Sequence, residues 1–83
     1  MPTHNYLSII SLNEFNYILR LHDIYVDENT QVKILRALRN NVYALYNETY
    51  QFVLEGYIET LASGITSQRI HQVINYFKPH LNV

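Results

Sequence analysis

The sequence predicts an all-α fold: a small bundle of three to five helices with a helix-turn-helix-like unit at its C-terminal end. Three observations favour this class. The 83 residues include only two Gly and two Pro, apolar residues recur at spacings of three and four, and no useful run alternates as a strand would. A chain this short buries only about 60% of the surface that its unfolded state exposes. We therefore expect residues 1–83 to form a single domain with one small core.

The first helix has a clear start signal. Ser11-Leu12-Asn13-Glu14 matches a capping box, in which the Ser hydroxyl and the Glu carboxylate satisfy free backbone N–H groups. The inward face that follows consists of Leu12, Phe15, Ile18, Leu19 and His22. The turn-forming residues of segment 23–29 predict a connector, and Asp27, Asn29 or Thr30 can cap the next helix.

The middle of the chain carries an apolar stripe at helical spacing. Its members are Leu35, Leu38, Val42, Leu45 and Phe52. Asn40-Asn41 can divide this stretch into two helices, or one helix can run through residues 30–62, because helix propensity alone does not decide. Glu55 and Glu59 are like charges four residues apart, which is typical of a solvated strip on an exposed helix face.

A second stripe, rich in tyrosine, lies about 100° around the same helix. It contains Tyr43, Tyr46, Tyr50, Val53 and Tyr57. A helix that is apolar on two sides needs two surfaces to pack against, and two interpretations are open. Both stripes are buried within one bundle, or the Tyr-rich side is a homodimer interface, which suits Tyr because its ring buries area while its hydroxyl stays hydrated.

The most specific local pattern lies near the end of the chain, at Gly64-Ile65-Thr66-Ser67-Gln68-Arg69-Ile70-His71-Gln72-Val73. In a helix-turn-helix, Gly makes the turn, the next apolar residue fills the corner between the helices, and Thr or Ser caps the recognition helix. Ile65, Ile70 and Val73 match the inner positions of that pattern. The pattern therefore predicts a recognition-type helix that begins near Thr66.

The boundaries of this unit follow from its turn residues. Ser63-Gly64 can end the preceding helix, since Gly accepts the left-handed backbone conformation found there. Pro79 predicts the end of the last helix. The helix-turn-helix-like segment then spans about residues 50–78, and Ile58 and Leu61 can pack inside it only if its turn is longer than usual.

The polar positions of the last helix suit duplex DNA. Arg can take guanine O6 and N7 as a fork, Gln and Asn can pair with adenine N6 and N7, and hydroxyls near a helix N-terminus can hold phosphate. The candidate DNA-binding residues are Thr66, Ser67, Gln68, Arg69, His71, Gln72, Asn75 and Lys78. An ordinary amphipathic helix with a solvated polar face would show the same pattern.

Three short resemblances accompany these residues. The segment from Gly64 to Val73 resembles the recognition segment of bacterial regulators, including the promoter-reading helix of sigma factors and the operator-reading helix of KorA-type plasmid repressors. Arg69-Ile70, Val73 and Phe77-Lys78-Pro79 are similar to the C-terminal pattern of the PapB-like fimbrial regulators, which implies DNA binding by an oligomer. Residues 12–21 resemble the first helix of Hha-type modulators, which implies a nucleoid protein as partner instead.

Composition excludes several classes of protein. The chain has no Cys, which excludes a disulfide scaffold and a thiolate metal site. Nothing approaches the roughly 20 apolar residues of a membrane-spanning helix, so we expect a soluble cytoplasmic protein without a membrane partner. The sequence has no Gly-rich phosphate loop, no metal-ligand spacing around His71 and no local Ser–His–acid arrangement. We expect no enzymatic activity, no metal and no cofactor.

Charge is unevenly distributed along a chain whose formal net charge is −1. Residues 1–62 hold all seven acids and four of the six Lys and Arg, whereas residues 63–83 hold Arg69 and Lys78 and no acid. An anionic partner is therefore expected at the C-terminal end. The leading hypothesis is a sequence-specific transcriptional regulator that binds duplex DNA as a homodimer through its last helix. The alternative is a non-enzymatic protein-binding module or co-regulator that uses the Tyr-rich face.

Overall fold

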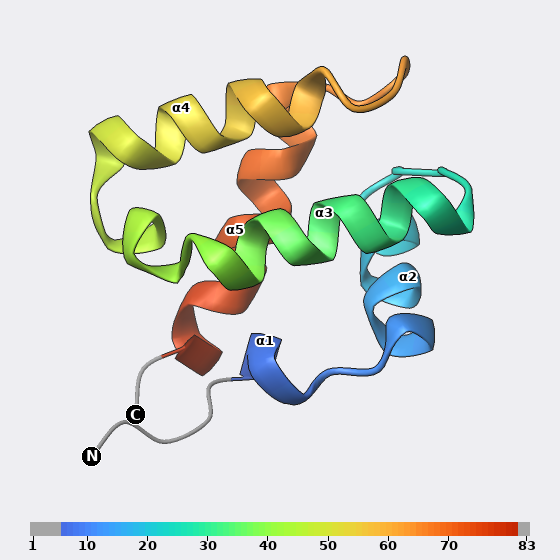
Figure 1. Ribbon diagram of the computed structural model, residues 1–83, viewed down its shortest axis with the longest axis horizontal. Helices are drawn as coiled ribbons and strands as arrows, with labels where there is room; N and C mark the ends of the chain where they lie inside the picture. The colour runs from blue at the N-terminus through green and yellow to red at the C-terminus, as the bar shows by residue number, and fades with distance from the viewer. Residues whose placement is uncertain (1–5, 82–83) are drawn as a thin grey trace.

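The computed structural model describes residues 6–81, all of whose regular elements are helices (Figure 1). These elements are α1 (Tyr6–Ile9), α2 (Leu12–Leu21), α3 (Glu28–Asn40), the 3₁₀ helix η1 (Val42–Tyr46), α4 (Glu48–Glu59) and α5 (Ser67–Leu81). No strand occurs within the described residues, which confirms the predicted all-α bundle. None of these helices combines the length and the apolar character that crossing a membrane requires.

Each of the four long helices begins at a polar side chain. Ser11, Asp27, Asn47 and Thr66 accept hydrogen bonds from backbone N–H groups in the first turns of α2, α3, α4 and α5. The hydrogen bonds from Thr30 hold the pKa of the Asp27 carboxyl below its usual value. The sequence predicted the cap at Ser11, gave Thr66 or Ser67 for α5, and gave Asp27 as one of three candidates for α3.

The connector after α2 closes that helix with a Schellman motif. Asp23 adopts a left-handed backbone conformation, with φ of 61°, in the position that Gly usually occupies. The N–H of Ile24 donates to the carbonyl of Leu19 over 2.9 Å, and the N–H of Asp23 donates to the carbonyl of Arg20 over 3.0 Å. The buried Ile24 side chain thus enters the core directly after the turn.

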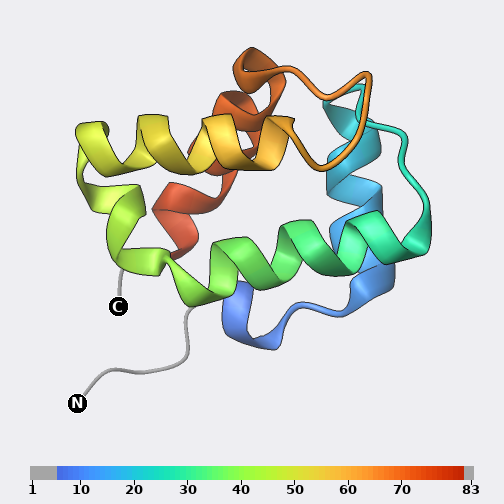
Figure 2. The ribbon, with the colours of Figure 1, turned by 45° about the horizontal axis from the view of Figure 1, so that its top comes forward.

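The stretch that one helix or two could occupy contains two α-helices, separated by η1. The Asn41 side chain donates to the carbonyl of Ala37 over 2.8 Å at the end of α3, and Asn47 caps α4. Side-chain amides that bond to nearby backbone groups compete with helix continuation. α3 and α4 consequently run in roughly opposite directions on one side of the molecule (Figure 2).

The core is organised around α5, which passes behind α3 in the view of Figure 1 and behind α4 in that of Figure 2. One side of this helix supplies four fully buried side chains, Ile70, Val73, Ile74 and Phe77. Phe77 stacks on Phe15 of α2, with ring centroids 6.0 Å apart. The predicted inner positions Ile65, Ile70 and Val73 are all buried, so this part of the pattern is confirmed.

Three sequence-based expectations about the helices are wrong. Phe52 is 75% exposed, because α4 starts a new helical phase after η1 and buries Leu54 and Ile58 instead. α5 continues to Leu81, so Pro79 lies within its last turn, where Pro removes a single backbone hydrogen bond. α4 ends at Glu59, ahead of Ser63-Gly64, although Gly64 does adopt the expected left-handed conformation with φ of 88°.

Arg39 attaches the first described residues to α3. Its Nε donates to the carbonyl of Leu7 over 2.7 Å, and its Nη2 donates to the carbonyl of Ile10 over 2.8 Å. Leu7 and Ile10 are themselves buried in the core. Two hydrogen bonds from one charged guanidinium therefore hold the segment around α1 against α3.

Replacing Arg39 with Met should lower the free energy of unfolding by about 2 kcal/mol, because both carbonyls lose a charged donor. The matched change Arg36→Met, one turn earlier on an exposed side chain, should alter it by less than about 0.5 kcal/mol. Urea unfolding followed by circular dichroism measures both. Equal stabilities for the two variants would contradict the assigned role of Arg39.

Candidate functional site

An open hollow on the surface of η1 and α4 collects exposed aromatic side chains. Tyr43, Tyr50, Val53 and Tyr57 line it, and each is 55–64% exposed. The rings of Tyr43 and Tyr50 meet edge to face, with centroids 6.1 Å apart. The other lining residues are Asn41 and the buried Ala44 and Leu54. The hollow therefore offers aromatic walls over an apolar base.

A second hollow continues the first one towards α3. Its lining residues are Lys33, Arg36, Ala37, Asn40, Asn41 and Tyr57, so it shares Asn41 and Tyr57 with the aromatic hollow. No carboxylate lines either hollow. We call the two together the tyrosine groove, with an aromatic half around Tyr50 and a basic half around Lys33. The volumes of the two hollows are about 220 and 270 Å³.

The exposure of the Tyr-rich stripe excludes one of its two interpretations, and the homodimer interface stays a prediction. Burial of that stripe within one bundle is excluded, because all five of its members are more than half exposed. Four of them share the groove, but Tyr46 lines a separate hollow with Lys78 and Pro79. Tyr46 departs from the stripe because η1 and the Asn47 cap interrupt the α-helix on which the spacing was counted.

The outward face of α5 carries the predicted DNA-binding residues. Thr66, Gln68, Arg69, His71, Gln72 and Asn75 are exposed, and Ser67 and Lys78 are half-buried. The centre of this face is a row of amides, Gln68, Gln72 and Asn75, at the spacing of one helix side. Six of these eight residues are thus exposed along one side of a helix whose other side is buried in the core.

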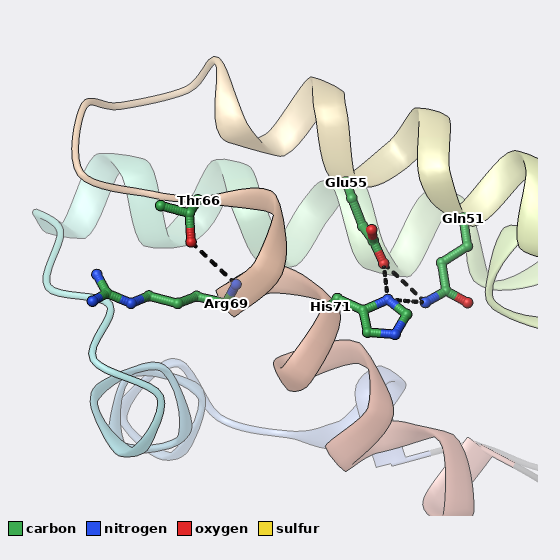
Figure 3. A network of polar contacts seen from close by, with 5 residues as sticks. All are labelled: Gln51, Glu55, Thr66, Arg69 and His71. Atoms are coloured by element: carbon green, nitrogen blue, oxygen red, sulfur yellow. Dashed lines mark hydrogen bonds and ion pairs between the residues drawn. The ribbon is translucent and has the colours of Figure 1, made fainter.

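Two donor groups of this face, the Ser67 N–H and the Arg69 guanidinium, already contact acceptors within the chain. The Ser67 N–H at the start of α5 donates to Glu59 Oε2 over 3.0 Å, so a carboxylate already occupies the position where phosphate would bind. The Arg69 side chain extends away from His71, and its Nη1 lies 3.5 Å from the carbonyl oxygen of Asp23 (Figure 3). The two cations on which an anionic partner was expected to act are thus Arg69, directed towards α2, and the half-buried Lys78.

A buried carboxylate joins α4 to α5 on the other flank (Figure 3). Glu55 is 5% exposed, and its Oε2 accepts from Gln51 Nε2 over 2.9 Å and from His71 Nδ1 over 2.7 Å. Gln51 Nε2 and His71 Nδ1 lie 3.1 Å apart because both converge on that one oxygen. Glu55 Oε2, Gln51 Nε2 and His71 Nδ1 thus form one cluster of polar contacts between α4 and α5.

This network corrects the interpretation of Glu55 and Glu59 as a solvated strip. Only Glu59 is exposed, whereas Glu55 is among the buried polar residues of the chain. A signal for this was present in the sequence: Gln51, Leu54, Glu55 and Ile58 follow the spacing of one helix face. His71 could not be assigned as the partner, because it lies sixteen residues away in the chain.

The hollow beside this network contains the His71–Glu55 pair but no hydroxyl nucleophile. Its lining residues are Glu48, Gln51, Phe52, Glu55, His71, Asn75 and Lys78, which include no Ser or Thr hydroxyl to act as a nucleophile. Within residues 6–81, no three His, Asp or Glu side chains are close enough to hold a metal ion together. The His71–Glu55 pair thus connects two helices, with the side chain of His71 half exposed.

No protein-family model, curated protein or solved structure matches this chain. The structure offers two candidate binding surfaces: the tyrosine groove and the outward face of α5. They lie on different sides of α4, since Tyr57 shares a hollow with α3 residues and Glu55 bonds to α5.

Removing the His71 side chain should leave Glu55 buried with a single donor. We expect His71→Ala to lower the free energy of unfolding by about 1–2 kcal/mol. In a Glu55→Leu background the same change should have a much smaller effect, because no carboxylate needs the donor. The neighbouring exposed Gln72→Ala serves as control. Additive effects of the His71 and Glu55 changes in chemical unfolding would show that the two side chains do not depend on each other.

Proposed function

We propose that this chain acts by binding rather than by catalysis, as a small protein-binding module whose tyrosine groove receives a segment of a partner protein. One observation carries the proposal. Tyr43, Tyr50, Val53 and Tyr57 lie together on the surface while the core is closed without them. Aromatic side chains are enriched where proteins meet, because they bury a large area with few rotatable bonds.

The size of this surface supports the same function. Each aromatic side chain carries about 150–250 Å² of area, so the three half-exposed tyrosines of the groove, together with Val53, leave an apolar patch on the order of 400 Å². This area lies within the roughly 300–600 Å² of the largest apolar patch on a typical monomer, and such a patch is often functional. The buried Ala44 and Leu54 beneath them give an incoming side chain an apolar contact.

A second copy of the chain is one conceivable partner, in agreement with the homodimer that the sequence led us to expect. A two-fold dimer brings the same patch of each copy together. Where the two-fold axis passes through the basic half of the groove, Lys33 and Arg36 of the two copies would meet with no lining carboxylate between them. Like charges across an interface oppose association, so we favour a different protein as the partner.

Duplex-DNA binding by a homodimer is the second candidate function, and the amide row of α5 favours it. Gln68, Gln72 and Asn75 are exposed at the spacing of one helix side, and amides can read adenine. The resemblance of residues 64–73 to recognition segments of bacterial regulators supports the same candidate. Two features weigh against it: Glu59 occupies the start of α5, and seven residues separate α4 from α5, whereas the usual turn of the motif has three or four.

A photo-crosslinking amino acid in place of Val53 should attach the chain to another protein in the cells that encode it. The same amino acid in place of Gln72, on the outward face of α5, is the matched control and should not. The Val53 crosslink should disappear when Tyr50 and Tyr57 are changed to Ala, with helix content unchanged by circular dichroism. Equal crosslinking from both positions, or none from Val53, would contradict the proposal.

The DNA candidate makes a separate prediction for a gel shift on the duplex upstream of the chain's own gene. Binding should weaken as salt rises, because Lys and Arg release counterions from phosphate. Arg69→Ala should weaken binding further, while Lys33→Ala, on the opposite side of α4, should not. Absence of any salt-sensitive shift would exclude this candidate and leave the protein-binding proposal unaffected.

A further inference from the structure

The basic half of the tyrosine groove is made of cations that form no ion pair with the described residues. Lys33 and Arg36 are exposed, and no carboxylate lies within 4 Å of either in the described part of the chain. The hydrogen bonds from Thr30 have the larger effect in lowering the pKa of the Asp27 carboxyl, and Lys33 helps to lower it. After Glu28, the whole of α3 contains Lys33, Arg36 and Arg39 and no acid.

These cations lie next to the tyrosines of the groove. Lys33, Arg36 and Tyr57 line one hollow, and Tyr57 continues into the hollow that Tyr43, Tyr50 and Val53 line. A chain that runs from the aromatic half into the basic half passes beside both positive charges. The protein has a formal net charge of −1, but the edge of this apolar surface is positively charged.

Charge complementarity then selects the occupant. Interfaces place positive groups opposite negative ones, which raises the rate of encounter and suppresses partners of the wrong sign. An apolar strip bordered by charge on one edge is matched by an amphipathic helix, with apolar residues three and four apart and acids beside them. The groove also lies between two helices, α3 and α4, which is the usual setting for a bound helix.

We propose that the tyrosine groove recognises an acidic amphipathic helix of a partner protein. This inference rests on the proposed protein-binding function and adds the chemistry of the ligand. Apolar side chains of the helix enter the aromatic half, between Tyr43, Tyr50 and Tyr57. Its Asp or Glu side chains lie against Lys33 and Arg36, where a carboxylate can accept from the ammonium or from the guanidinium fork.

A display library of random peptides, selected on the folded full chain, tests this inference. A parallel selection on the Tyr50→Ala/Tyr57→Ala variant removes peptides that bind elsewhere. We expect the remaining peptides to be enriched in Asp and Glu beside apolar residues at helical spacing. Their affinity should fall about tenfold or more with Lys33→Glu/Arg36→Glu. The control Arg20→Glu/Arg69→Glu changes the net charge equally, outside the groove, and should have a much smaller effect.

The other outcomes separate the ligand chemistry from the proposed function. Tyrosine-dependent peptides that are neutral or basic would overturn the acidic ligand and keep the protein-binding groove. Absence of any tyrosine-dependent peptide would overturn both. A single-stranded oligothymidine that binds the wild-type chain and is lost with Tyr50→Ala/Tyr57→Ala would assign the groove to nucleic acid, because exposed aromatic rings beside cations also stack on bases. A dimer in sedimentation that the same variant dissolves would assign it to a second copy.

Discussion

The interruption between α3 and α4 is the constraint on which the rest of the surface depends. The Asn41 amide bonds back to Ala37, η1 occupies the next five residues, and Asn47 caps the following helix. In a continuous helix over the same residues, the cations and the tyrosines would lie at separate points along one axis. The reversal instead lays α4 beside α3, so that Tyr57 and Lys33 line one hollow although they are far apart in the chain.

The opposite side of α4 keeps the groove in place. Leu54 and Ile58 are buried, and the Glu55 carboxylate bonds to His71 of α5 as well as to Gln51. A buried charge is costly unless its partners are correctly placed, so this contact restricts how α4 can rotate on α5. The tyrosines on the outer side of α4 are therefore presented in a fixed orientation, which lowers the entropic cost of binding.

Local signals in the sequence predicted the elements well. The capping box at Ser11, the Thr66 cap and the inner positions Ile65, Ile70 and Val73 rest on contacts between neighbouring residues or on simple periodicity. The buried phase of α4 was harder, because it depends on where the helix restarts after η1. Counting spacings from α3 through the interruption placed Phe52 in the core and kept Tyr46 with the other tyrosines.

The features that make up the candidate sites depend on contacts that sequence spacing does not encode. Arg39 bonds to carbonyls 32 and 29 residues away, and Glu55 meets His71 from a different helix. The basic half of the groove was missed for the same reason. The sum of charges along the chain pointed to the C-terminal end as the binding site for an anion. Lys33 and Arg36 instead line a hollow together with Tyr57, which comes from the neighbouring helix α4.

A map of amide chemical shifts in the ¹⁵N-labelled chain, recorded with and without a selected acidic peptide, tests the central claim most directly. We expect the largest changes in two separate stretches, around Lys33 to Tyr43 and around Tyr50 to Tyr57. Amides on the outward face of α5, at Gln68 and Gln72, should stay nearly unchanged. Changes that cluster on that face of α5, with the tyrosine groove unaffected, would contradict the account.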